Sequence, residues 1–264
     1  MQNDQNIKSA IQEQFGKNSA KYVTSQTHAQ GEDLARLVEW MEPKTSWVAL
    51  DIATGGGHAA KALSPKVGTL FATDFTREML KTARSHLDES CSNVFYVAAD
   101  AETLPFLDAS FDAVTCRIAA HHFPNPDLFI REAARVMKPG GKFVLIDNVA
   151  PADESLDRFI NTVEMLRDES HVRAHTLKQW TQWMEDAQLV PVRSVVRKKR
   201  IPFESWVKRM AADEAQEQRV REFMLGADPE TKAYFSIREE DGDVTSFELD
   251  EWMVLLKKPH GDSI

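Results

Sequence analysis

The chain has 264 residues, of which 42% are hydrophobic and 28% are charged, a composition typical of a globular protein with one sizeable core and not of a disordered or fibrous chain. Its 41 acidic residues outnumber the 32 basic ones, and the net charge of −9 disfavours nucleic acid and anionic membrane surfaces as partners. No apolar run approaches the length of a membrane span or a signal peptide, and the two cysteines, Cys91 and Cys116, form no metal or disulfide pattern, so we expect a cytoplasmic protein with free thiols.

An N-terminal helical cap is predicted over residues 1–42. Ile7, Ile11 and Phe15 recur at intervals of four, which indicates a short amphipathic helix, and the apolar pattern of residues 34–41 indicates a second one. Residues 16–30 between them are polar, with Tyr22 as the one aromatic side chain. We interpret this segment as a mobile connection that could close over a ligand.

Residues 43–150 alternate between β-rich and helical patterns. The expected strands cover residues 47–52, 69–73, 94–99, 113–117 and 142–149. Helical patterns cover residues 77–87 and 128–136, and the second ends before Pro139-Gly140-Gly141. Strands that alternate with helices over short links predict an α/β fold with a Rossmann-like, doubly wound and mostly parallel sheet.

The alternation loosens over residues 151–264. Helices are expected at residues 156–166 and 177–187, a strand at 189–196, a helical insert at 203–226, and strands at 245–247 and 252–257. No repeat or linker divides the chain. We therefore predict a single domain, 1–264, with a seven-stranded sheet and the insert before the last strand.

A glycine loop follows the first expected strand. Gly55, Gly57 and Ala60 fit the G-x-G-x-x-A dinucleotide pattern, and Asp74 stands 19 residues beyond Gly55, where an acid binds ribose hydroxyls. A nicotinamide-dependent oxidoreductase is therefore one alternative. However, Asp51 lies four residues before the first glycine, and two like charges at about 4 Å repel by about 4 kcal/mol at an effective dielectric constant of about 20. A ligand carrying an ammonium and a sulfonium group suits this loop better than a pyrophosphate does.

Five motifs in order resemble those of the class I S-adenosylmethionine (SAM) dependent methyltransferases, over approximately residues 47–149. They are Leu50-Asp51-Ile52-Ala53-Thr54-Gly55-Gly56-Gly57, the strand ending in Asp74, Asp100-Ala101-Glu102-Thr103-Leu104-Pro105-Phe106, Phe111-Asp112-Ala113-Val114, and Arg135-Val136-Met137-Lys138-Pro139-Gly140-Gly141. Ala53 stands where the family usually has glycine. The small-molecule group around the quinone-biosynthesis C-methyltransferases is the most similar.

The resemblance implies SAM as cofactor, with Asp74 on the ribose hydroxyls and Asp100 on the adenine amine. The full set of expected cofactor-binding residues is Tyr22, Asp51, Ala53, Thr54, Gly55, Gly57, Asp74, Phe75, Met79, Asp100, Ala101, Glu102 and Arg117. Asp51, Asp74 and Asp100 end or closely follow three neighbouring strand patterns, so they are expected to face one crevice. The implied reaction is methyl transfer to a small-molecule acceptor with release of S-adenosylhomocysteine. A SAM-binding protein without catalytic activity is a further alternative.

His121 and His122 follow the fourth expected strand and are the candidates for a general base, although they also suit packing beside the cofactor. His171 and His175 are spaced like half of a zinc site but have no third ligand in the pattern, so no metal is expected. The basic run of residues 197–200 is interpreted as protection of a sheet edge. A homodimer is possible, because the sequence does not determine the oligomeric state.

Overall fold

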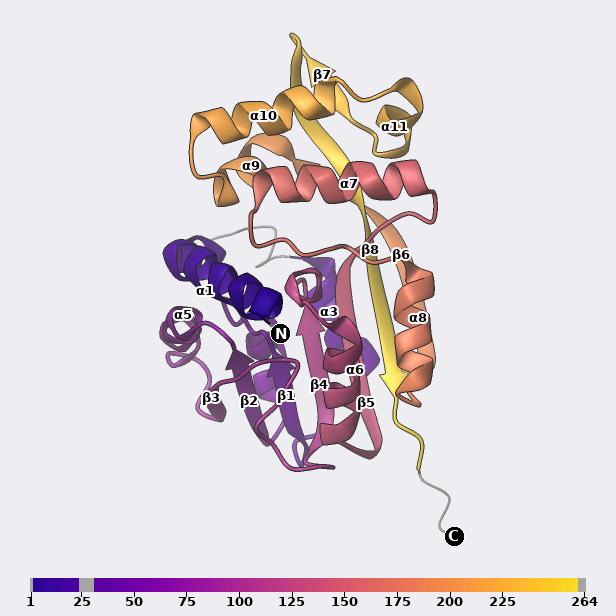
Figure 1. Cartoon of the computed structure of the whole chain (residues 1–264). Coiled ribbons are helices and arrows are strands. Elements are labelled where there is room, and N and C mark those ends of the chain that lie inside the picture. Colours follow the sequence, from indigo (N-terminus) through magenta and orange to yellow (C-terminus); the bar gives the residue numbers. More distant parts are fainter. Residues whose placement is uncertain (1, 24–30, 261–264) are drawn as a thin grey trace.

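The computed structural model describes residues 2–23 and 31–260, with side chains described for residues 4–16 and 31–260. Within these residues eight strands form one sheet, in the order β3-β2-β1-β4-β5-β8-β6, and β7 pairs with β8 outside this path (Figure 1). The strands are β1 (Val48–Ile52), β2 (Thr69–Asp74), β3 (Val94–Ala98), β4 (Phe111–Arg117), β5 (Met137–Val149), β6 (Val190–Pro202), β7 (Arg238–Glu240) and β8 (Asp243–Lys257). β1 to β5 pair in parallel, and β8 runs antiparallel between β5 and β6. The mostly parallel, doubly wound architecture is thus confirmed.

Helices cover both faces of this sheet. The elements are α1 (Gln2–Val23), α3 (Glu32–Met41), α4 (His58–Leu63), η1 (Ser64–Lys66), α5 (Arg77–Leu87), η2 (Ala120–His122), α6 (Pro126–Val136), α7 (Glu154–Arg167), α8 (Leu177–Asp186), α9 (Phe203–Met210), α10 (Glu214–Leu225) and α11 (Pro229–Tyr234). The helices α6 and α8 share one apolar cluster with the sheet, while α3, α4 and α5 share a second cluster on the other face. None of the described helices combines the length and hydrophobicity that a bilayer crossing requires.

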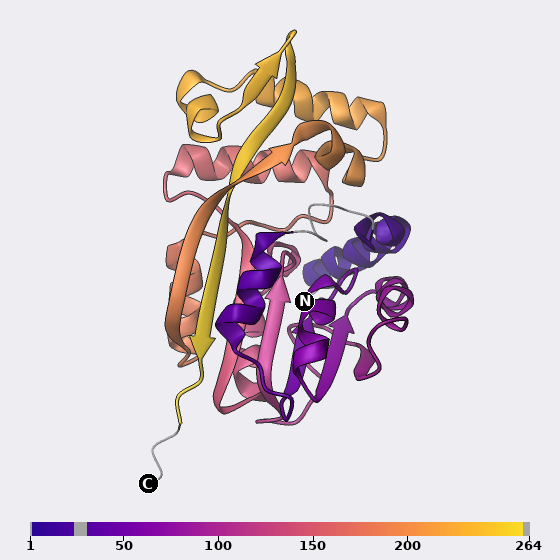
Figure 2. The same cartoon turned by 180° about the vertical axis from the view of Figure 1, so that it is seen from behind.

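A cap of α7, α9, α10 and α11 stands beyond the carboxyl ends of the parallel strands, together with the first part of β8 (Figures 1 and 2). It has its own apolar cluster, which includes the buried side chains Phe203, Trp206, Val220 and Met224. Phe247 and Leu249 of β8 belong to this cluster, whereas Val254 and Leu256 of the same strand belong to the core. One continuous strand therefore connects the cap to the main sheet.

The structure corrects the interpretation of residues 16–30 as a connection. The first helix does not end near Phe15 but continues to Val23, so residues 16–23 are helical. A single glycine inside a helix costs only about 1 kcal/mol, and α1 packs along α5, which stabilises the longer helix. The rest of the expected connection, residues 24–30, lies outside the described part of the chain.

Four expectations about the strands were wrong. The strand expected at 189–196 is β6, which continues to Pro202. β5 begins at Met137 and not at 142, because Gly140 adopts a φ of 79° that lets the Pro139-Gly140-Gly141 segment stay within the sheet. The two strands expected at 245–247 and 252–257 are one strand, β8. With β7 the sheet has eight strands instead of seven, and the insert before β8 extends beyond residue 226 to include α11.

Candidate active site

A cavity opens where β1, β2 and β4 end. The turn after β1 forms its floor, and three residues of that turn have positive φ: Ala53 at 52°, Gly55 at 54° and Gly57 at 84°. Ala53 keeps the left-handed backbone conformation even though it carries a Cβ, which costs about 1 kcal/mol. The turn therefore accommodates an alanine at this position.

The glycines of this turn have different roles. Gly55 lines the cavity, and its backbone N–H donates to Asp74 Oδ2 at 3.0 Å. Gly57 is not among the cavity-lining residues, although the sequence predicted it to bind the cofactor. A Cβ on Gly57 would lie 2.9 Å from Leu87 Cδ1, so this glycine permits α4 and α5 to pack closely.

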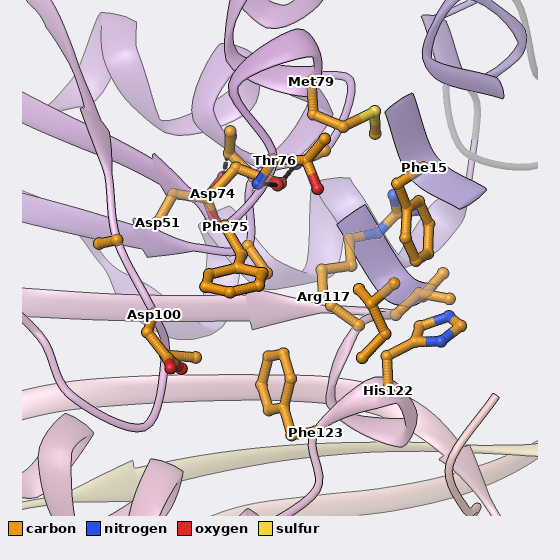
Figure 3. A pocket seen from close by; sticks show the side chains of 18 of the residues that line it. Phe15, Asp51, Asp74, Phe75, Thr76, Met79, Asp100, Arg117, His122 and Phe123 are labelled. Carbon is orange, nitrogen blue, oxygen red and sulfur yellow. Dashed lines mark hydrogen bonds between the residues drawn. The ribbon is translucent and has the colours of Figure 1, made fainter. Parts of the chain in front are cut away.

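Asp51, Asp74 and Asp100 all line the cavity, so the predicted shared crevice is confirmed as geometry. Asp51 is tied inward, because it accepts hydrogen bonds at 2.7 Å from the hydroxyls of Thr54 and Thr115. Asp74 accepts from the backbone N–H groups of Gly55 and Thr76. These two bonds hold the Asp74 carboxylate in a fixed orientation at the end of β2 (Figure 3).

Asp51 and Asp74 are buried, and their hydrogen bonds only partly compensate for the loss of water around the charged carboxylates. Desolvation raises the pKa of Asp74 to about 6, and the charge of Asp51 adds to this effect, although the N–H donors of Thr76 and Gly55 oppose it. Desolvation also raises the pKa of Asp51 above its ordinary value, against the hydroxyls of Thr54 and Thr115. A cationic ligand in this cavity would relieve both penalties.

Helix α1 forms the roof of the cavity, which the sequence analysis missed. Lys8, Ile11 and Phe15 line the cavity from one helix face, because they are spaced by three and four residues. The ammonium of Lys8 lies 2.6 Å from both Asp100 Oδ2 and Glu102 Oε2. The sequence pattern had identified an apolar face through Ile11 and Phe15, but not the lysine beside them.

Arg117 points into the cavity from the end of β4 (Figure 3). Its Nε lies 2.5 Å from Asp33 Oδ2 of α3, and both side chains are buried. Burial alone would raise the pKa of Asp33, but the hydrogen bond and charge of Arg117 outweigh it and lower that pKa. This ion pair fixes the guanidinium at the cavity wall.

The two adjacent histidines of η2 have different environments. His121 is buried and lies outside the cavity lining, and its Nδ1 lies 2.5 Å from Asp147 Oδ1. His122 lines the cavity, and its Nδ1 lies 2.9 Å from the backbone oxygen of Ser170. Only His122 is therefore placed to contact a ligand.

Most of the residues predicted to bind a cofactor surround one cavity. Those that line it are Asp51, Ala53, Thr54, Gly55, Asp74, Phe75, Met79, Asp100, Ala101, Glu102 and Arg117. The backbone of Tyr22 lies in the last turn of α1, and its side chain lies outside the described residues. Lining residues that the prediction did not include are Lys8, Ile11, Phe15, Gly56, His58, Ala59, Thr76, Ala99, Ile118, Ala119, Phe123 and Pro124.

His171 and His175 have structural partners. The Nε2 of His171 lies 3.1 Å from Asn161 Oδ1, and the ring of His175 packs edge-on against Trp180 and Trp183. In residues 31–260 and the described part of α1, no three His, Cys, Asp or Glu side chains are grouped to hold a metal ion. The basic run lies on β6 at the sheet edge, where Arg197 and Lys199 pair with Glu251.

Comparison with known proteins agrees with the geometry. Residues 50–145 match the methyltransferase domain family. The chain is 38% identical over 226 residues to YcgJ of Bacillus subtilis (strain 168), described as an uncharacterized methyltransferase, and the match covers 84% of this chain and 88% of YcgJ. It is also 34% identical over 118 residues to the ubiquinone/menaquinone biosynthesis C-methyltransferase UbiE of Brucella anthropi, covering 42% of this chain and 45% of that enzyme.

Solved structures extend the similarity to the whole fold. The BH2331 protein of Bacillus halodurans C-125 superimposes with a TM-score of 0.84 at 41% identity, covering 87% of this chain and 100% of that one. The YcgJ structure superimposes with a TM-score of 0.82 at 36% identity, covering 86% and 98%. The resemblance inferred from the sequence motifs is thereby confirmed, and the chain belongs to the methyltransferase family.

Proposed function

We propose that the protein transfers the methyl group of SAM to a small-molecule acceptor and releases S-adenosylhomocysteine. The observation that carries this proposal is the shared cavity of Asp51, Asp74 and Asp100 beside the glycine turn. Buried carboxylates with raised pKa values favour a cationic ligand, and SAM carries a sulfonium and an ammonium group. When bound, SAM supplies an electrophilic methyl group whose leaving thioether needs no proton.

The residues present fit this ligand chemically. Asp74, with its orientation fixed by two N–H donors, suits the ribose hydroxyls, and Asp100 suits the exocyclic amine of adenine. Phe75 and Met79 offer apolar surface to the nucleoside. Gly55 allows close approach of the methionine part, because it has no Cβ. The cavity wall at Arg117 suits the methionine carboxylate.

A nicotinamide dinucleotide fits less well. Its pyrophosphate would lie at the glycine turn, close to the buried carboxylates of Asp51 and Asp74, where like charges repel in a poorly solvated site. The methyltransferase relatives also give no support to an oxidoreductase. Two buried free cysteines, Cys91 and Cys116, support our further proposal that the protein works in the cytoplasm.

Binding and turnover test the proposal separately. Calorimetry with SAM, S-adenosylhomocysteine and NAD⁺ should give binding of the first two and none of the third, and binding of NAD⁺ alone would contradict the assignment. A screen of small-molecule acceptors with methyl-labelled SAM then tests catalysis. Binding without labelled product across a broad screen would favour a SAM-binding protein without catalytic activity. Size-exclusion chromatography with light scattering tests whether the protein is a homodimer.

A further inference from the structure

His122 lies across the cavity from Asp74 and Asp100, near Phe15 and Arg117, and Phe123 lies between His122 and Asp100 (Figure 3). In the proposed function Asp74 and Asp100 hold the nucleoside. The opposite end therefore remains for the acceptor, and the imidazole of His122 lies there.

Hydrogen bonding fixes the tautomer of His122. The backbone oxygen of Ser170, 2.9 Å from Nδ1, can only accept a hydrogen bond. The Ser170 hydroxyl donates to Asp168 Oδ1 at 2.5 Å, so towards Nδ1, 3.4 Å away, it also acts as an acceptor. Nδ1 must therefore carry the hydrogen, which leaves a lone pair on Nε2 when the ring is neutral.

The surroundings keep His122 neutral. Burial lowers its pKa below the ordinary value, and the charge of His121 lowers it further, against the carboxylates of Asp168 and Asp147. His121 is the charged neighbour: burial opposes its charge, but the ion pair with Asp147 outweighs burial and raises its pKa. His171 also faces this pair, with its ring centroid 6.3 Å from that of His122, and Lys8 and Arg117 line the same cavity.

Next to the guanidinium of Arg117, which the proposed function assigns to the methionine carboxylate, the cavity wall at His122 is aromatic. The ring of Phe15 meets the ring of His122 edge-on at 4.8 Å between centroids, and Ile11, Ile118 and Phe123 are further apolar residues that line the cavity. Such a wall favours a flat, uncharged acceptor. A neutral hydroxyl on such a molecule loses its proton when it is methylated, and this loss calls for a base.

We propose that His122 is the general base of the methyl transfer and that the acceptor is an apolar aromatic hydroxyl compound, that is, a phenol. This inference rests on the proposed function. The phenol oxygen forms a bond to the methyl carbon, the methyl–sulfur bond breaks with its electron pair remaining on sulfur, and the hydroxyl proton moves to Nε2 of His122. After product release His122 returns this proton to water.

Two phenols of different acidity test the role of the base. The probes are phenol and 4-nitrophenol, assayed with methyl-labelled SAM at mildly alkaline pH, where 4-nitrophenol is largely ionised already. The test variant is His122→Asn, whose amide nitrogen can still donate to the Ser170 oxygen but which has no Nε2. Turnover of phenol should fall by roughly 10²–10⁴-fold, and turnover of 4-nitrophenol should fall far less.

Controls separate this proposal from the proposed function. His260→Asn, an exposed histidine near the carboxyl-terminal end of the described chain, should leave turnover unchanged. His122→Asn should bind S-adenosylhomocysteine with wild-type affinity, which establishes that it is folded. Equal losses for the two phenols, or no turnover of either by a wild-type protein that binds S-adenosylhomocysteine, would overturn the proposal. Failure of the wild type to bind S-adenosylhomocysteine would instead contradict the proposed function.

An independent readout needs no turnover. Nitrogen-15 NMR of the complex with S-adenosylhomocysteine, with the His122 signals assigned by their loss in His122→Asn, should show hydrogen on Nδ1 and none on Nε2 at neutral pH. A hydrogen on Nε2 of the neutral ring would disprove the assignment, whatever the activity assays give.

Discussion

Asp74 illustrates how a single side chain combines structural and binding roles. Its carboxylate closes the glycine turn through Gly55 and at the same time faces the cavity. We expect Asp74→Asn to weaken S-adenosylhomocysteine binding by about 1.5–3 kcal/mol, or roughly 10- to 150-fold, because a charge-assisted hydrogen bond to the ribose is lost. Calorimetry measures this change. Asp127→Asn, on the exposed start of α6, is the control, and unchanged affinity of a folded Asp74→Asn variant would count against the ribose assignment.

The raised pKa of Asp74 also predicts a pH dependence of binding. Below its pKa of about 6 the carboxyl is protonated, so affinity for S-adenosylhomocysteine should fall as pH decreases through this value and stay constant above it. The sign for stability is opposite. Because the pKa of Asp74 in the folded protein lies above the ordinary aspartate value of 3.8, the contribution of Asp74 to stability falls as pH rises from about 4 to about 6. Titration calorimetry at several pH values tests the pH dependence of affinity. If the affinity of Asp74→Asn changes with pH as that of the wild type does, the effect belongs to another titratable group.

At the scale of elements, the packing of α4 against α5 depends on Gly57. Alanine at this position would combine a φ of 84° with a Cβ 2.9 Å from Leu87 Cδ1. We expect Gly57→Ala to lower the free energy of unfolding by about 1–3 kcal/mol. Gly16→Ala in α1 is a matched control, because a Cβ there would meet no described atom outside its own helical backbone within 4 Å, and it should be neutral or stabilising by up to about 1 kcal/mol. Denaturant titration gives the free energy of unfolding of both variants. Equal changes in Gly57→Ala and Gly16→Ala would refute a role of Gly57 in helix packing.

The roof helix α1 is held over the cavity in part by one ion-pair cluster. Lys8 bridges Asp100 and Glu102, and Gln12 Nε2 donates to the Phe75 oxygen at 3.1 Å. Because Lys8 is partly exposed, we expect Lys8→Met to loosen α1 by only about 0.2–1 kcal/mol, seen as up to about fivefold faster hydrogen exchange of its backbone amides. Lys81→Met, at an exposed ion pair on α5, should leave exchange in α1 unchanged. Unaltered exchange in Lys8→Met would show that the ion pairs of Lys8 do not hold the roof.

At the scale of the whole molecule, β8 couples the cap to the core, because its residues belong to both apolar clusters. Because of this coupling, we expect the fully buried cap residue Met224 to stabilise the core as well as the cap. Met224→Ala should therefore lower the global free energy of unfolding by about 2–5 kcal/mol. Hydrogen exchange of the β4 amides, which lie in the core, should accelerate accordingly. The control is Met165→Ala, which is 51% exposed on α7. Unchanged exchange in β4 would mean that cap and core unfold separately, against the predicted single domain.

Local sequence signals were enough to predict much of this architecture. The glycine turn, Asp74 and Asp100 could be placed because each directly follows a strand pattern. Lys8 and Asp33 could not, because their partners Asp100 and Arg117 are more than 80 residues away in sequence. The sequence also could not show that His122 lines the cavity whereas His121 does not. This difference depends on their distant partners, Ser170 for His122 and Asp147 for His121.

The division of β8 into two expected strands has a similar cause. The acidic residues Glu248, Asp250 and Glu251 interrupt its apolar pattern, and such an interruption is typical of the end of one strand and the start of another. In the fold Asp250 pairs with Lys198 and Glu251 pairs with Arg197 and Lys199 of β6. The basic run interpreted as edge protection therefore also neutralises these acids across the strand pair.

The position of β8 between β5 and β6 sets an order of assembly. During synthesis β6 emerges before its neighbour exists, whereas β1 to β5 can already pair with one another. A chain interrupted between residues 203 and 242 would thus leave two unpaired strand edges, and β6 would present Val190, Val192 and Val196 to solvent with no partner strand. Open edges of this kind recruit other chains, so truncated products of this gene should aggregate instead of accumulating as folded fragments.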